Sequence, residues 1–173
     1  MKKLWVPLLV ALLVTAMTGP AGGVVTAAEP RVTTESIMVP AAAFTPSADT
    51  YGYLNNGWVI EATPGAFVAP LHFPVASVSI RKLTIYAYDH VSTGGQITDV
   101  CAHLFRSAPA TAAVVPQGQV CTFGTSATTD PPVFSTTAIS PRQVNTVVHG
   151  SYLWVLIPAG DARFYGVKVT YSY

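Results

Sequence analysis

The sequence predicts an all-β protein whose strands form a single antiparallel sandwich. Short stretches rich in β-branched and aromatic residues are separated by turn residues along the chain, which has 14 Pro and 13 Gly among its 173 residues. Several of these stretches alternate apolar and polar residues with a period of two, which is typical of strands with one buried face. No stretch long enough for a helix has apolar residues at the helical spacing. About eight to ten short strands of this kind indicate a sandwich or a barrel.

The alternating stretches allow the buried face of some strands to be predicted. Ile80–Asp89 alternates most clearly, and we expect Leu83, Ile85 and Ala87 on its core face. Ile97–Arg106 also alternates. Cys101 and the residues at every second position from it are therefore expected on one face, and Ala102 on the opposite face. Both stretches are therefore predicted to be strands of the sandwich.

Three further strands are expected outside this alternating pair. Trp58–Ala62 is rich in β-branched and aromatic residues, and Tyr152–Ile157 is a continuous apolar run. Because the whole of that run is apolar, we expect Trp154 to lie in the core. The last strand is predicted from a set of residues at a period of two at the end of the chain: Tyr165, Val167, Val169, Tyr171 and Tyr173.

The arrangement of these strands is predicted to be jelly-roll-like. They are uneven in length and show no repeat, which argues against a propeller or a solenoid. An immunoglobulin-like sandwich is the alternative, but it usually has a Trp between two widely spaced cysteines. Here Cys101 and Cys121 are 20 residues apart, with no Trp between them.

The first 28 residues are predicted to be a secretory signal peptide. Lys2 and Lys3 form a basic start, and the apolar segment Leu4–Met17 follows. A 14-residue helix is about 21 Å long, shorter than the roughly 30 Å hydrocarbon core of a bilayer. Cleavage is expected after Ala27 or Ala28, and the protein is therefore expected to be secreted or periplasmic.

The remaining chain is predicted to be one domain with a short leader. Glu29–Glu35 is polar and is expected to be flexible, and Ser36–Tyr173 is expected to form the sandwich. Beyond residue 28, seven Lys and Arg stand against eight Asp and Glu. This near-neutral balance excludes a polybasic nucleic-acid-binding protein, and the mature chain has no second apolar run long enough to span a membrane.

Cys101 and Cys121 are the only cysteines, and we expect them to form a disulfide. An even number of cysteines in an exported protein favours this pairing. A redox or nucleophilic pair is disfavoured, because the spacing is not Cys-x-x-Cys and no basic residue adjoins either thiol.

No catalytic motif is present, and the protein is predicted not to be an enzyme. The sequence lacks Gly-x-Ser-x-Gly, His-Glu-x-x-His and a recognisable pair of catalytic carboxylates. We therefore predict no catalytic residue, no metal ligand and no cofactor. A small secreted hydrolase is the enzymatic alternative, and it would need a pocket where histidines and carboxylates converge.

Aromatic residues carry the only binding hypothesis. Tyr51, Tyr53 and Trp58 surround an Asn-Asn-Gly turn and would form a stacking surface for a sugar ring or another flat ligand. Tyr86 and Tyr88, with the tyrosines at the end of the chain, would suit self-association if their faces meet solvent.

The predicted function is therefore that of an exported, non-enzymatic binding or surface module with an unidentified ligand. A self-associating structural surface protein and a carbohydrate-binding module are the alternatives to this interpretation. The corresponding candidate partners are a second copy of the chain and a surface glycan.

Several strand-like stretches together resemble exported bacterial β-sandwich proteins of no known function. They are Val78–Asp89, a cysteine-containing strand, Tyr152–Pro158 and Phe164–Tyr171. The resemblance covers most of Val39–Tyr173 in general layout. It implies a fold and a compartment, and it assigns no activity and no functional residue.

Overall fold

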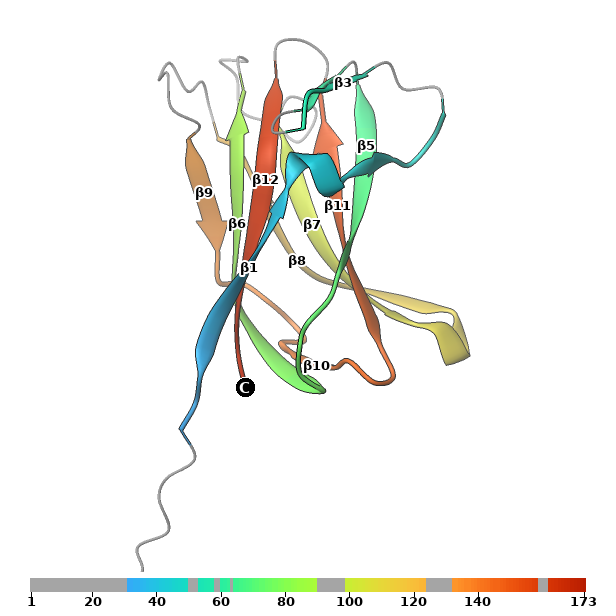
Figure 1. Ribbon diagram of the computed structural model, residues 1–173, viewed down its shortest axis with the longest axis vertical. Helices are drawn as coiled ribbons and strands as arrows, with labels where there is room; N and C mark the ends of the chain where they lie inside the picture. The colour runs from blue at the N-terminus through green and yellow to red at the C-terminus, as the bar shows by residue number, and fades with distance from the viewer. Residues whose placement is uncertain are drawn as a thin grey trace, which may run out of the picture. The chain divides into compact units, whose positions relative to one another are not determined.

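The computed structural model of the chain describes residues 31–49, 53–57, 60–62, 64–89, 99–123, 132–158 and 162–173. Val32–Tyr173 form one compact unit. The described residues contain twelve strands in two antiparallel sheets and two short 3-10 helices, η1 (Ala41–Ala43) and η2 (Pro109–Thr111) (Figure 1).

One sheet has seven strands and the other has five. The seven are β1 (Thr34–Pro40), β3 (Tyr53–Asn55), β4 (Ile60–Ala62), β6 (Ser77–Tyr88), β9 (Val133–Thr136), β10 (Gln143–Asn145) and β12 (Arg163–Ser172). The five are β2 (Thr45–Pro46), β5 (Gly65–Leu71), β7 (Cys101–Ala108), β8 (Ala113–Cys121) and β11 (Gly150–Ile157).

Eight of these strands pair in a nested order that defines a jelly roll. β1 pairs with β12, β5 with β11, β6 with β9 and β7 with β8, so the first strand of the roll pairs with the last and the pattern continues inwards. Further pairing of β12 with β6 and of β11 with β7 joins these pairs into the orders β1-β12-β6-β9 and β5-β11-β7-β8. Figure 1 shows β1, β12, β6 and β9 side by side. This order confirms the jelly-roll prediction and excludes the immunoglobulin-like alternative.

The two sheets enclose one apolar core. Leu83, Ile85 and Ala87 of β6 are fully buried, as the alternation in the sequence predicts. The rings of Phe44 and Phe164 meet edge to face in this core, with centroids 4.8 Å apart. Burial alternates with a period of two in β11, which places one face of the five-stranded sheet in the core. In β6 the alternation is incomplete, because Thr84 on the opposite face is also buried.

The first strand begins earlier than the sequence suggests. Thr33 and Tyr173 exchange two backbone hydrogen bonds of 3.0 and 3.1 Å, and β1 starts at Thr34. The Glu35 carboxylate accepts hydrogen bonds of 2.9 Å from the hydroxyls of both Tyr171 and Tyr173. Thr33–Glu35 therefore belong to the sheet, which corrects the predicted leader boundary at Glu35.

These contacts predict a tyrosine that ionises only in strongly alkaline solution. Burial, and then the hydrogen bond to Glu35 and its negative charge, raises the pKa of Tyr171 to about 12. An unfolded tyrosine has a pKa of about 10. The raised pKa means that the protonated Tyr171 hydroxyl stabilises the folded state, and this stabilisation is complete below pH 10 and is lost as the pH rises towards 12. In Glu35→Gln we expect the last step of a tyrosinate absorbance titration to move towards pH 10. A titration curve identical to that of the unmodified protein would contradict this assignment.

Candidate binding surface

Only one of the three residues predicted to form a stacking surface lies in the described part of the chain. Tyr53 is in β3 and is 43% exposed. Its ring packs edge to face on Phe67, with centroids 5.4 Å apart. Tyr51 and Trp58 lie outside the described residues, so the three-residue surface stays a prediction.

A different set of aromatic rings lies on the outer face of the five-stranded sheet. In β11, Leu153 and Val155 are buried in the core, whereas Tyr152 and Trp154 are half-buried on the opposite face. The expectation that Trp154 lies in the core is therefore wrong. Its position in the alternation of β11 turns the indole away from the other sheet.

The neighbouring strand adds two more rings to the same face. In β7, His103 and Phe105 are half-buried and alternate with core residues. Antiparallel pairing places His103 beside Trp154 and Phe105 beside Tyr152. We call these four residues, His103, Phe105, Tyr152 and Trp154, the aromatic strip.

The rings of the aromatic strip contact one another. Phe105 and Tyr152 are stacked, with centroids 5.2 Å apart and planes inclined by 15°. Trp154 is tilted by 43° from His103, with centroids 5.3 Å apart. Stacking thus covers part of the Phe105 and Tyr152 faces, while Trp154 stands at an angle to the other rings.

The strip is electrically neutral. Burial lowers the pKa of the His103 imidazole, so the ring is uncharged at neutral pH. Its Nε2 atom is buried, with no hydrogen-bond partner among the described residues. The other three members of the strip are a Phe, a Tyr and a Trp, and none of them is an acidic or basic residue.

Uncharged residues also flank the strip on both neighbouring strands. On β5, Val68 is the register partner of Trp154, and Pro70 follows two residues later on the same face. On β8, Gln119 is the partner of His103 and is exposed. The outer face therefore offers a neutral surface that crosses four strands, with an amide at one end.

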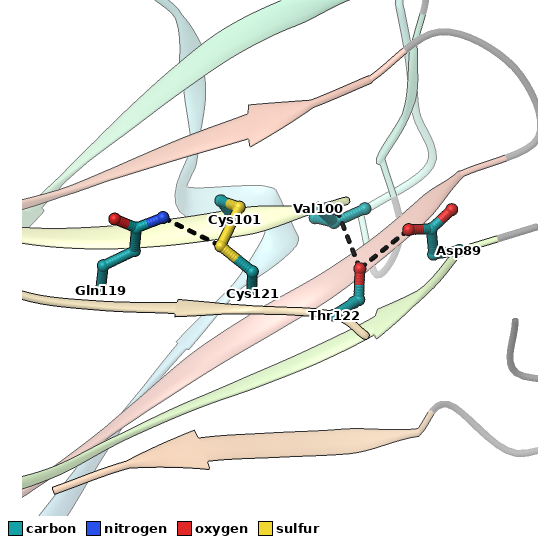
Figure 2. Close-up of a disulfide and its surroundings, with 6 residues drawn as sticks. All are labelled: Asp89, Val100, Cys101, Gln119, Cys121 and Thr122. Carbon is teal, nitrogen blue, oxygen red and sulfur yellow. Dashed lines mark hydrogen bonds between the residues drawn. A yellow bond between two sulfur atoms is a disulfide. The ribbon is translucent and has the colours of Figure 1, made fainter. Parts of the chain in front are cut away.

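The predicted disulfide is confirmed and lies on this same face. Cys101 and Cys121 are directly opposite each other in β7 and β8, with Cα atoms 4.1 Å apart. Gln119 Nε2 donates a 3.0 Å hydrogen bond to Cys121 Sγ, which is a weak acceptor (Figure 2). The disulfide joins β7 to β8 next to the amide end of the surface.

A buried polar contact lies just beyond the disulfide. Thr122 Oγ1 donates a 2.9 Å hydrogen bond to Asp89 Oδ2 and accepts a 3.0 Å hydrogen bond from the Val100 backbone N–H (Figure 2). These bonds tie the end of β6 to the ends of β7 and β8. In the described ranges, no three His, Cys, Asp or Glu residues lie close enough to bind a metal ion.

The tyrosine rows predicted to favour self-association do not form continuous open faces. Tyr86 is half-buried, and Lys168 Nζ lies 5.9 Å from the centre of its ring. Tyr171 is buried, whereas Tyr173 is exposed. Within the described part of the chain, no helix has the length and apolar character needed to cross a membrane.

Comparisons with known proteins give only distant similarities. No protein-family model and no curated protein matches the chain. A solved structure of the CBM36-1 domain of a multidomain xylanase, from the hindgut metagenome of Trinervitermes trinervoides, is 13% identical, with 78% of this chain and 96% of that one covered and a TM-score of 0.42. The structure of the Gx strain of infectious bursal disease virus is 11% identical, with 83% and 32% covered and a TM-score of 0.40.

Proposed function

We propose that the protein is an exported, non-catalytic module that binds neutral carbohydrate on the aromatic strip. The observation that carries this proposal is a neutral, half-buried group of aromatic rings on a sheet face, centred on Trp154. Export is supported by the signal-like first 28 residues, and the Cys101–Cys121 disulfide is compatible with an oxidising compartment.

A sugar ring suits this surface for two reasons. One side of a pyranose carries mainly C–H groups and packs against an aromatic face, while its hydroxyls need hydrogen-bonding groups at the edge. Trp154 is tilted out of the stack and supplies the ring face. The exposed Gln119 amide, whose Nε2 contacts sulfur, supplies an oxygen and a second N–H for hydroxyl groups.

The residues of the aromatic strip favour binding of a carbohydrate over its hydrolysis. Glycosidic hydrolysis generally uses two carboxyl groups placed on either side of the scissile bond. The four residues of the strip and their register partners Val68 and Gln119 include no carboxylate. A charged polysaccharide would also find no opposite charge at these positions.

The proposal predicts glycan binding that depends on Trp154 and not on Tyr53. On an array of neutral oligosaccharides we expect the unmodified protein to bind, and Trp154→Ala to weaken binding about tenfold or more, as is typical when a central aromatic contact is removed. Tyr53→Ala is the matched control, because it removes an exposed ring from β3. Thermal unfolding of both variants checks that they are folded.

Two outcomes would contradict this assignment. Equal binding by Trp154→Ala and the unmodified protein would remove the strip as the site. Loss of binding only in Tyr53→Ala would instead place the site at the turn that contains Tyr53.

A further inference from the structure

We infer that the open edge of β1 pairs with β1 of a second copy of the chain, which gives a symmetric dimer with one sheet continuous across both subunits. Among the described residues, β1 pairs only with β12, so its other edge has no strand beside it. Within Thr34–Pro40, only Ile37 and Val39 are not exposed. This edge belongs to the seven-stranded sheet, whereas the aromatic strip belongs to the five-stranded sheet.

The register of β1 on β12 shows which backbone groups face the open edge. Thr33 and Tyr173 exchange both of their backbone hydrogen bonds. In an antiparallel pair, residues that do so recur at every second position, so the odd-numbered residues of β1 bond to β12. The N–H and C=O groups of Thr34, Ser36 and Met38 therefore point away from β12. In the described part of the chain, these groups have no backbone hydrogen bond.

β1 lacks the features that usually protect an edge strand from pairing. Natural edge strands are often very short, or they carry Lys, Pro or a bulge. β1 has seven residues in unbroken register with β12, contains no Lys, and has its one Pro at its end.

The long edge strand of the other sheet has such features. β8 contains Pro116, and its register with β7 shifts at this position. The Gln117 carbonyl also accepts a 2.7 Å hydrogen bond from the Ser140 backbone N–H, which occupies part of that edge. The contrast between the two strands indicates that β1 is the edge suited to a partner strand.

The sequence of β1 favours a second copy as that partner. In an antiparallel pair centred on Ser36, Thr34 lies opposite the partner's Met38, and Ser36 lies opposite the partner's Ser36. Every outward N–H and C=O group of Thr34, Ser36 and Met38 is then bonded. Glu35 lies opposite the partner's Ile37, so no like charges meet. Such two-fold pairing closes on itself, as most homodimers do.

The neighbouring registers are less favourable. A pair centred on Glu35 would place the two Glu35 carboxylates directly opposite each other, which is destabilising. A pair centred on Ile37 would place Thr34 opposite the partner's Pro40, which has no N–H to donate. Ser36 is therefore the residue expected on the two-fold axis.

A matched pair of substitutions at Ser36 tests whether this edge associates. Ser36→Pro removes an outward N–H, and edge strands tolerate Pro at such positions. Ser36→Ala keeps the N–H, and both variants lose the 2.9 Å hydrogen bond between Ser36 Oγ and Thr170 Oγ1. In sedimentation equilibrium, we expect the unmodified protein and Ser36→Ala to dimerise with a Kd on the order of 100 µM, since one strand pair is a small interface. Ser36→Pro should dimerise about tenfold more weakly or less.

Cysteine cross-linking tests the register. In the expected pair the two Ser36 Cα atoms are about 5.5 Å apart, within the roughly 4.4–6.8 Å range of a disulfide. The two Met38 Cα atoms are four residues apart along the strands, or about 14 Å. Ser36→Cys should therefore form a disulfide-linked dimer on mild oxidation, and the equally exposed Met38→Cys should form about tenfold less of it.

The controls separate this dimer from the carbohydrate proposal. Trp154→Ala should dimerise as the unmodified protein does, so failure of the glycan experiment does not affect this result. A monomer at every concentration up to about 500 µM would overturn the inference, as would equal dimerisation by Ser36→Pro and Ser36→Ala. If Ser36→Pro does not fold, equal cross-linking of Ser36→Cys and Met38→Cys would overturn it instead.

Discussion

Replacing Phe164 by alanine is expected to lower the free energy of unfolding by about 3–5 kcal/mol. Phe164 is fully buried in β12, at the point where this strand pairs with both β4 and β6. Its ring meets Phe44 edge to face, with an interplanar angle of 85°. Alanine would leave a cavity where the two sheets are joined, and close packing prevents the neighbours from filling it.

Denaturant unfolding of a matched pair of variants measures this effect. Phe123→Ala is the control, because Phe123 is 76% exposed and its removal should change stability by about 0.5 kcal/mol or less. Similar midpoints for the two variants would contradict the position of Phe164 in the core.

Removal of the disulfide is expected to produce the second large loss of stability. The bond closes a loop with a sequence separation of 20 residues, so the double variant Cys101→Ala/Cys121→Ala should lose about 3 kcal/mol in the chain-entropy model. The loss arises mainly in the unfolded chain, which gains freedom when the cross-link is absent. Both cysteines are buried. Alanine at position 121 also removes the sulfur that accepts the hydrogen bond of Gln119 Nε2, but Gln119 is exposed and its amide can bond to water instead.

A comparison under reducing conditions provides the control for this variant. Without reductant, the double variant should unfold at a lower guanidinium concentration than the unmodified protein, whereas full reduction of the unmodified protein should abolish most of that difference. A double variant as stable as the oxidised protein would show that the cross-link does not restrict the unfolded chain.

The sequence predicts strands well wherever polar and apolar residues alternate. Leu83, Ile85 and Ala87 of β6 are buried as expected, because one-sided burial imposes a period of two on the sequence. The pairing of Cys101 with Cys121 is also predictable, since the chain contains no other cysteine.

The aromatic strip is less predictable, because its strand is apolar on both faces. Tyr152 and Trp154 stand in a run with Leu153 and Val155, so hydrophobicity does not distinguish the outer face from the core. The amphipathic character of the side chains could have distinguished the outer face of this strand from its core face. Tyr and Trp alternate in this run with purely aliphatic residues and have polar groups that favour a half-exposed position.

Features made by distant segments are beyond prediction from local patterns. Glu35 joins the sheet through hydroxyls at the end of the chain, and nothing adjacent to it in sequence indicates those partners. A cavity of about 340 Å³ is lined by residues near 71, 109 and 147, which only the nested pairing of strands brings together. Both features follow from topology.

The emission of Trp154 tests the proposed binding surface most directly. The chain contains Trp5, Trp58 and Trp154, so Trp5→Phe/Trp58→Phe leaves Trp154 as the only tryptophan. Addition of a neutral glycan that the protein binds should shift the emission of this variant to shorter wavelength, because the sugar displaces water from the indole. Unchanged emission at a saturating concentration of that glycan would contradict carbohydrate binding on the aromatic strip.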